Sequence, residues 1–96
     1  MPKGNLIVHR RVIESDGSLV EIKVWQVPKN PRQPHGFKYS LVYIVEGQRI
    51  LGYDNAHGRD HRHIREKGYP YTFRSPGALI EDFLRDLADV QPEGQV

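Results

Sequence analysis

The sequence contains no cysteine among its 96 residues. This absence excludes a thiolate nucleophile, a disulfide scaffold and a Cys-ligated zinc site, and it agrees with a reducing cytoplasm. Long apolar runs are also missing, since stretches such as residues 41–45 fall far short of the roughly 20 residues that a membrane-spanning helix needs. No signal-peptide core follows residues 1–5. We therefore expect a cytoplasmic protein that neither spans a membrane nor is exported through a signal peptide.

The chain is too short for two hydrophobic cores. With 38% apolar and 27% charged residues, it has the composition of one small soluble domain. A domain of this size buries only a little over about 60% of the surface of its unfolded chain, so a partner or a second copy would add to its stability. We expect a single domain over residues 1–90 and a disordered tail over residues 91–96, which lack apolar periodicity.

The formal net charge of +2 conceals an uneven distribution of charge along the chain. Residues 1–75 contain 13 Lys and Arg against 7 Asp and Glu, whereas residues 76–96 contain 1 against 5. A basic body with an acidic end has two differently charged surfaces. Basic surfaces commonly bind nucleic acid or acidic proteins.

Alternating apolar residues predict an antiparallel sheet in the first half of the chain. The dipeptide Asp16-Gly17 favours a tight hairpin turn between two β-branched segments, and a proline-rich loop follows at residues 28–36. Consecutive pairing of the segments makes the sheet a meander. The predicted strands are residues 6–13, 19–27, 37–46 and 49–54, with a short fifth strand at residues 71–73 on an edge.

Ser75-Pro76 predicts the start of a helix. The serine oxygen can accept a hydrogen bond from an exposed backbone amide, and proline suits the first helical position. The fold class is therefore α+β, with an antiparallel meander of four to five strands packed against a C-terminal helix. The apolar face of this helix is predicted to hold Leu79, Ile80, Phe83, Leu84, Leu87 and Ala88, while Glu81, Asp82, Arg85, Asp86 and Asp89 point away from the sheet.

The segment 53–71 departs from this plan because it concentrates ionisable residues, including three of the five histidines within seven positions. Histidine has an unperturbed pKa of roughly 6.5, so it can both take and give a proton near neutrality. Arginine and lysine nearby would attract a phosphodiester. The candidate catalytic residues are Asp54, Asn55, His57, Asp60, His61 and His63, and the candidate RNA-binding residues are Arg59, Arg62, Arg65, Lys67, Tyr53 and Tyr71.

Three chemical interpretations of this segment are open. In metal-independent RNA cleavage, one histidine removes the 2′-hydroxyl proton, another protonates the leaving oxygen, and an arginine or lysine neutralises the phosphorane. In a metal site, the three histidines act with Asp54 or Asp60, although their spacing matches no closed structural zinc pattern. In a binding module, the same residues hold nucleic acid or an acidic protein without catalysis. Asp54 and Asn55 are also ordinary turn residues.

Residues outside this segment are expected to have structural roles. His9 lies in a predicted strand and His35 in the proline-rich loop, so each is expected to be structural or solvated. Lys38 is expected to be solvated. Core packing is the expected role of the aromatic residues at strand positions, which are Trp25, Phe37, Tyr39, Tyr43 and Phe73.

The run Tyr53-Asp54-Asn55-Ala56-His57-Gly58, followed by Asp60-His61-Arg62-His63, resembles the core motif of the TumE-like toxins of toxin–antitoxin modules. The early hairpin, the tyrosine-rich third strand and the terminal helix are similar too, so the resemblance covers residues 6–90. It implies a growth-inhibiting toxin encoded beside an antitoxin, usually a helix-turn-helix DNA-binding protein that masks the toxin. The motif points to Asp54, Asn55, His57, Asp60, His61 and His63 as the functional residues.

These observations together predict a toxin that cleaves RNA without a metal or another cofactor. The alternative is a non-catalytic module that binds nucleic acid or the antitoxin through the same surface. The small size of the chain also leaves room for a homodimer. In the predicted mechanism two histidines serve as base and acid, one carboxylate orients an imidazole, and two guanidinium groups hold phosphate. The residues in these roles are His57 with His61 or His63, then Asp54, then Arg62 with Arg59 or Arg65.

Overall fold

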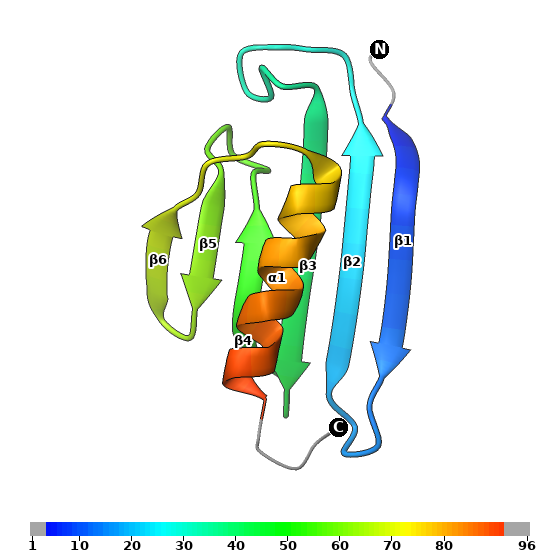
Figure 1. Ribbon diagram of the computed structural model, residues 1–96, viewed down its shortest axis with the longest axis vertical. Helices are drawn as coiled ribbons and strands as arrows, with labels where there is room; N and C mark the ends of the chain where they lie inside the picture. The colour runs from blue at the N-terminus through cyan, green and yellow to red at the C-terminus, as the bar shows by residue number, and fades with distance from the viewer. Residues whose placement is uncertain (1–3, 92–96) are drawn as a thin grey trace.

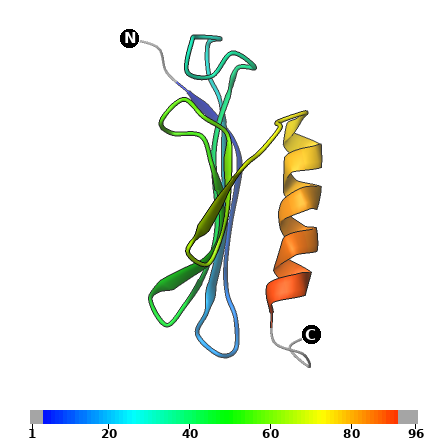
Figure 2. The same ribbon diagram turned by 90° about the vertical axis from the view of Figure 1, so that its left-hand side faces the viewer.

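A computed structural model describes residues 4–91 and arranges them in two layers, a six-stranded antiparallel sheet and one helix (Figure 1 and Figure 2). Each strand pairs with the next along the chain, which makes the sheet a meander. Within residues 4–91, no helix is long and apolar enough to cross a membrane. The elements are β1 Asn5–Ile13, β2 Leu19–Gln26, β3 Phe37–Val45, β4 Gln48–Asp54, β5 His61–Ile64, β6 Lys67–Pro70 and α1 Pro76–Val90.

The predicted α+β class, the first four strands and the helix are confirmed. The first hairpin turns at Gly17, whose positive φ of 86° suits glycine, while the Asp16 carboxylate accepts a hydrogen bond from the Ser18 backbone N–H at 2.9 Å. The tail expected at 91–96 lies outside the described residues except for Gln91, the C-cap of α1.

Helix α1 begins where the sequence predicts. The Ser75 hydroxyl accepts a hydrogen bond from the Ala78 backbone N–H at 3.1 Å, and Pro76 occupies the first turn. The helix packs over β3 and β4, as Figure 1 shows. The core between the layers consists of Val20, Ile22 and Val24 from β2, Tyr39, Leu41 and Tyr43 from β3, Leu51 and Tyr53 from β4, and Leu79, Phe83 and Leu87 from α1.

Two predictions about the faces of α1 are wrong. Leu84, expected on the apolar face, is 47% exposed because the helix covers β3 and β4 rather than the whole sheet. Asp82 and Asp86, expected to point away, have side chains that are only 13% and 14% exposed. Both carboxylates accept hydrogen bonds from tyrosine hydroxyls on the sheet side, which accounts for their burial.

The prediction of a fifth strand at residues 71–73 is also wrong. The sheet continues instead through the hairpin of β5 and β6, within the histidine-rich segment 53–71, for which the sequence predicts strands only at its ends. Residues 71–73 form an extended connection to α1, held by aromatic packing: the Phe73 ring stacks on His35 at 4.0 Å, and the Tyr71 ring meets Tyr53 edge-on at 5.0 Å between centroids. This packing, rather than strand pairing, explains their aromatic character.

The face of the sheet away from α1, here called the open face, is uncovered among the described residues (Figure 2). Directly paired residues of neighbouring strands share a face. The pairings Trp25 with Lys38, Ser40 with Asp54, and Asp54 with His61 therefore identify its residues. Trp25, expected in the core, lies on this face and is half-buried, because it alternates with the core residues of β2.

We predict that two leucines of α1 differ in how much their substitution by alanine destabilises the fold, because one is buried and the other is half-exposed. Leu79 is fully buried, so Leu79→Ala should lower the free energy of unfolding by about 2–5 kcal/mol. The matched control Leu84→Ala should lower it by only about 0.5 kcal/mol, because its side chain is already half-exposed. Urea denaturation measures both. Equal losses would contradict the placement of α1.

Candidate active site on the open face

The register between β4 and β5 brings three of the predicted site residues to the open face. Asp54 pairs directly with His61, and His63, two residues further along β5, pairs with Gly52. Residues two apart on a strand point to the same face. Asp54, His61 and His63, here called the Asp-His-His cluster, therefore project together from two neighbouring strands.

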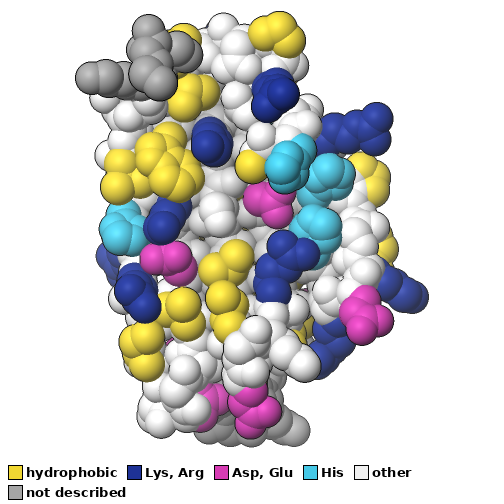
Figure 3. All heavy atoms as spheres, turned by 180° about the vertical axis from the view of Figure 1, so that it is seen from behind, with side chains coloured by type: hydrophobic (Ala, Val, Ile, Leu, Met, Phe, Trp, Pro, Cys, Tyr) yellow, Lys and Arg dark blue, Asp and Glu magenta, His cyan; other side chains and the backbone are white. Residues whose placement is uncertain are grey.

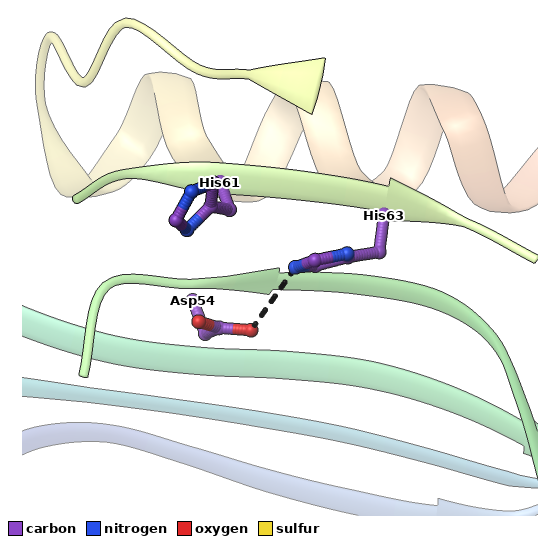
Figure 4. Close-up of side chains that lie close together, drawn as sticks. All are labelled: Asp54, His61 and His63. Atoms are coloured by element: carbon purple, nitrogen blue, oxygen red, sulfur yellow. Dashed lines mark ion pairs between the residues drawn. The ribbon is translucent and has the colours of Figure 1, made fainter. Parts of the chain in front are cut away.

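The three side chains of the cluster lie close together. His63 Nε2 is 3.8 Å from Asp54 Oδ2, and the His61 and His63 ring centroids are 5.6 Å apart. One nitrogen or oxygen from each residue lies within 4.8 Å of those of the other two. Figure 4 shows the His63 ring reaching from β5 toward the Asp54 carboxylate, with the His61 ring beside them. One small group, such as a phosphate or a metal ion, could contact all three.

Two glycines leave space for neighbouring side chains, Gly68 for the His63 ring and Gly52 for the Arg49 side chain. Gly52 and Gly68 pair with His63 from the strands on either side. A methyl group at Gly68 would lie 3.3 Å from two atoms of the His63 ring, so the ring rests against the backbone of β6. At Gly52, a methyl group would lie 2.9 Å from Cδ of Arg49, whose side chain crosses this position. The absence of two side chains thus sets the positions of an imidazole and a guanidinium.

The cluster lies in a groove of about 560 Å3 on the open face, here called the histidine groove. Its chemistry is mixed, with imidazoles, one carboxylate, two basic side chains and an indole. Figure 3 shows histidine, basic and acidic side chains gathered on this face. The groove is lined by Trp25, Lys38, Tyr39, Ser40, Arg49, Asp54, Ala56, His57, His61 and His63.

Electrostatics in the groove favour a neutral His63. Burial lowers the pKa of the His63 imidazole below its ordinary value of 6.5, and the Arg49 guanidinium lowers it further, against the opposing effect of Asp54. Arg49 Nη1 also lies 3.8 Å from Asp54 Oδ2. At neutral pH the neutral His63 ring has a lone pair free to accept a proton or bind a metal.

Asn55, a predicted catalytic residue, is completely buried beneath the end of β4. Its side-chain oxygen accepts a hydrogen bond from the Tyr39 backbone N–H at 3.0 Å, and its side-chain nitrogen donates to the Phe37 carbonyl at 2.8 Å. Its own carbonyl accepts from Gln33 Nε2 at 3.3 Å. These bonds fix the end of β4 to β3, so Asn55 holds the backbone beside Asp54 and does not line the histidine groove.

Asp60, another predicted catalytic residue, takes part in a separate network. Its carboxylate accepts hydrogen bonds from the Tyr39 hydroxyl at 2.6 Å and from His35 Nε2 at 3.0 Å. His35 Nδ1 in turn accepts from the Phe37 backbone N–H, so the proton of this imidazole is on Nε2. The network joins the proline-rich loop to the start of β5. His35 thus has a structural role.

Arg62, Tyr53 and Tyr71, predicted to bind RNA, point toward α1. The Tyr53 hydroxyl and Arg62 Nε both donate to Asp86 Oδ2, each at 2.5 Å. Burial, together with the neighbouring Asp86 carboxylate, raises the pKa of Tyr53 above its ordinary value. The Tyr71 hydroxyl donates to Asp82, and burial together with this bond raises the pKa of Tyr71 to about 12. Tyr53 and Arg62 therefore join the sheet to the helix, and Tyr71 joins the connection before α1 to the helix, all on the side opposite the histidine groove.

The remaining predicted RNA-binding residues are exposed at the margins of the site. Arg59 lines a second hollow that reaches His61 and His63 from the side of β6. Arg65 and Lys67 lie at the far end of the β5–β6 hairpin, in a hollow shared with Arg49. Arg59 therefore shares a hollow with the two histidines, whereas Arg65 and Lys67 at the hairpin turn do not.

Sequence reasoning missed Trp25, Ser40 and Arg49 as groove residues. The alternation of β2 carried the signal for Trp25, since the residues two and four positions before it are charged. For Arg49 no such signal exists. A β-bulge leaves Ile50 without a partner in the β3–β4 register, so Arg49 shares a face with Asp54 despite the odd separation.

We predict that Asn55→Ala destabilises the fold. The substitution leaves the buried Tyr39 N–H and Phe37 carbonyl without partners, at a cost of about 1–3 kcal/mol for each group. The matched control Asn5→Ala, at an exposed position of β1, should change the free energy of unfolding by less than about 0.5 kcal/mol. Urea denaturation compares them. A loss no larger than that of the control would contradict the structural role.

We also predict how charge controls the titration of His63. In metal-free buffer, the NMR titration of its ring protons should have a midpoint below 6.5. Arg49→Gln should raise this pKa, because a positive neighbour is lost, and Asp54→Asn should lower it further, because a negative one is lost. The control Arg11→Gln, on β1 and four strands away from β5 in the sheet, should leave it unchanged. Shifts of opposite sign would refute this electrostatic account.

Comparisons with known proteins give one informative match. No curated protein matches the chain, and no solved structure does. A family described as Toxin TumE matches residues 3–91, which is nearly the whole chain and includes every strand and the helix. The resemblance noted at the Asp-Asn and histidine motif is therefore confirmed, and the chain belongs to the Toxin TumE family.

Proposed function

We propose that this toxin cleaves RNA in the histidine groove, with His61 and His63 as the acid and base. The observation that carries the proposal is the pair of imidazoles, 5.6 Å apart beside the Asp54 carboxylate, on a sheet face that α1 does not cover. Two imidazoles at this separation can contact the same phosphodiester from two sides. The reaction needs no metal or other cofactor.

The proposed reaction transfers two protons and replaces the bond from phosphorus to the 5′ oxygen with a bond from phosphorus to the 2′ oxygen. His63, which its surroundings keep neutral, removes the proton of the ribose 2′-hydroxyl, and the 2′ oxygen attacks the neighbouring phosphorus. The bond from phosphorus to the 5′ oxygen breaks, and protonated His61 gives its proton to that oxygen. The products are a 2′,3′-cyclic phosphate and a 5′-hydroxyl. Asp54, 3.8 Å from His63 Nε2, stabilises the protonated form of His63.

Basic and aromatic side chains of the groove supply RNA binding in this proposal. Lys38 and Arg49 line the groove and take the phosphate role that Arg62 cannot fill while it is bound to Asp86. Trp25 offers a ring on which a base can stack. His57, which also lines the groove, and Arg59, at its margin, extend the binding surface. Asn55 and Asp60 support the site through the backbone of β4 and the start of β5.

The family also leads us to propose the protein's setting in the cell. A toxin needs a partner that neutralises it, and we propose a helix-turn-helix DNA-binding antitoxin encoded beside it. The basic groove would bind RNA when that antitoxin is absent. A cytoplasmic location and a homodimer stay predictions.

Incubation of purified protein with RNA tests the enzymatic proposal. We expect cleavage that survives a chelator and falls by about 10²–10⁴-fold in His61→Ala and in His63→Ala, the usual contribution of a general acid or base. The matched control His9→Ala changes an exposed histidine on β1 and should cleave at the wild-type rate. Mass analysis of the fragments should find the cyclic phosphate.

Other outcomes distinguish the alternatives. RNA that is bound by all variants and cut by none would support the non-catalytic module in place of the enzyme. Cleavage that disappears with the chelator would show a metal-dependent reaction and overturn the acid–base mechanism. Cleavage with equal rates in all three histidine variants would place the active site elsewhere.

A further inference from the structure

We propose that Asp54, His61 and His63 also form a binding site for a transition-metal ion such as Zn²⁺, and that the bound ion switches the groove off. The first part of this inference stands on the geometry of the cluster. The second part, inhibition, rests on the proposed ribonuclease function. The site differs from a catalytic metal centre because the ion binds His61 and His63, the two residues proposed as acid and base.

The ligand types suit such an ion. Imidazole nitrogen and carboxylate oxygen are preferred ligands of zinc and its neighbours, and two imidazoles favour these metals over magnesium or calcium. Zn–N and Zn–O bonds of about 2.0–2.2 Å place tetrahedral ligand atoms about 3.3–3.5 Å apart. The cluster already has its three donor atoms within 4.8 Å of one another, with one pair at 3.8 Å. Side-chain rotations that move the donor atoms by about 1 Å close the remaining difference.

Strand pairing holds the backbone beneath the cluster in this arrangement when the hairpin is closed. All three ligands come from paired strands, not from loops, and Asp54 is paired directly with His61. The His63 ring is supported by the backbone at Gly68. Buried Asn55, next to Asp54, fixes the end of β4. Three protein ligands leave a fourth position open to water, as in many zinc sites.

Arg49 is the group that opposes binding. Its Nη1 lies 3.8 Å from Asp54 Oδ2, so it competes with a cation for the carboxylate and adds a positive charge beside the site. A metal ion must therefore displace Arg49 from Asp54. This competition makes Arg49 a diagnostic residue, since its removal should strengthen metal binding, whereas removal of a ligand should weaken it.

Inhibition follows from the loss of free imidazole nitrogens. A histidine that binds a metal through a ring nitrogen has no lone pair there to accept a proton and no proton there to give. With both His61 and His63 bound to the ion, neither step of the proposed reaction can occur. Zinc would thus act as a reversible off-switch, and a chelator would restore activity.

Zinc binding to the metal-free full-length protein tests the site directly. We expect competition with a chromogenic chelator to show one Zn²⁺ per chain, and Asp54→Asn or His61→Ala to weaken binding more than about tenfold, the loss seen when even an outer partner of a ligand is removed. Arg49→Gln should strengthen binding. The matched control His9→Ala should bind as wild type does. Circular dichroism checks that each variant is folded. If His61→Ala does not fold, the isosteric variant Asp54→Asn decides the outcome.

The results separate the two proposals. Absence of stoichiometric zinc binding, or equal affinity in wild type and the Asp54→Asn variant, would overturn the metal site whatever the protein does to RNA. Zinc binding by a protein that never cuts RNA would support the metal site and contradict the ribonuclease proposal. RNA cleavage that continues at the same rate in zinc-saturated protein would overturn the switch alone.

Discussion

The Asp86 carboxylate on α1 fixes which face of β4 and β5 turns toward the helix. It accepts hydrogen bonds from Tyr53 on β4 and Arg62 on β5, two residues that pair directly with each other. A slip of one residue in either strand would reverse every side chain on it, and would leave the largely buried Asp86 carboxylate without its partners. The neighbouring pair, Asp54 and His61, is therefore held on the open face. The position of the histidine groove depends on a bond network on the opposite side of the sheet.

Much of the fold could be predicted because its signals are local. Clean alternation and an Asp-Gly turn identify the early strands, and Ser75-Pro76 identifies the helix start. The β5–β6 hairpin carries no such signal, since β5 consists of His61, Arg62, His63 and Ile64 and lacks an apolar alternation. Its turn places Arg65 at a φ of 54°, a conformation usually taken by Gly or Asn. The burial of Asp82 and Asp86 was equally hidden, because their partners come from distant strands.

The site could be predicted in part, for a similar reason. The motif predicted Asp54, His61 and His63 as candidate site residues, and the register brings them together. The same motif contains Asn55 and Asp60, whose side chains support the backbone, because proximity in sequence does not tell which of two faces a side chain takes. The basic residues of the groove, Lys38 and Arg49, lie outside the motif, on β3 and at the start of β4, and a bulge changes the alternation at Arg49. Pairing and bulges are properties of the folded sheet.

The location of the two histidines on a short outer hairpin links the site to a local equilibrium. Strands β5 and β6 have four residues each, β6 is exposed throughout, and within residues 4–91 β5 joins strands β1–β4 only by pairing with β4. Short outer elements of this kind separate from a sheet at a lower free-energy cost than global unfolding. Such opening would carry His61 and His63 away from Asp54, which belongs to the longer and better buried β4. Closure of the hairpin would then set the fraction of molecules in which the Asp-His-His cluster is complete, and substitutions at its exposed turn would change that fraction without disturbing the core.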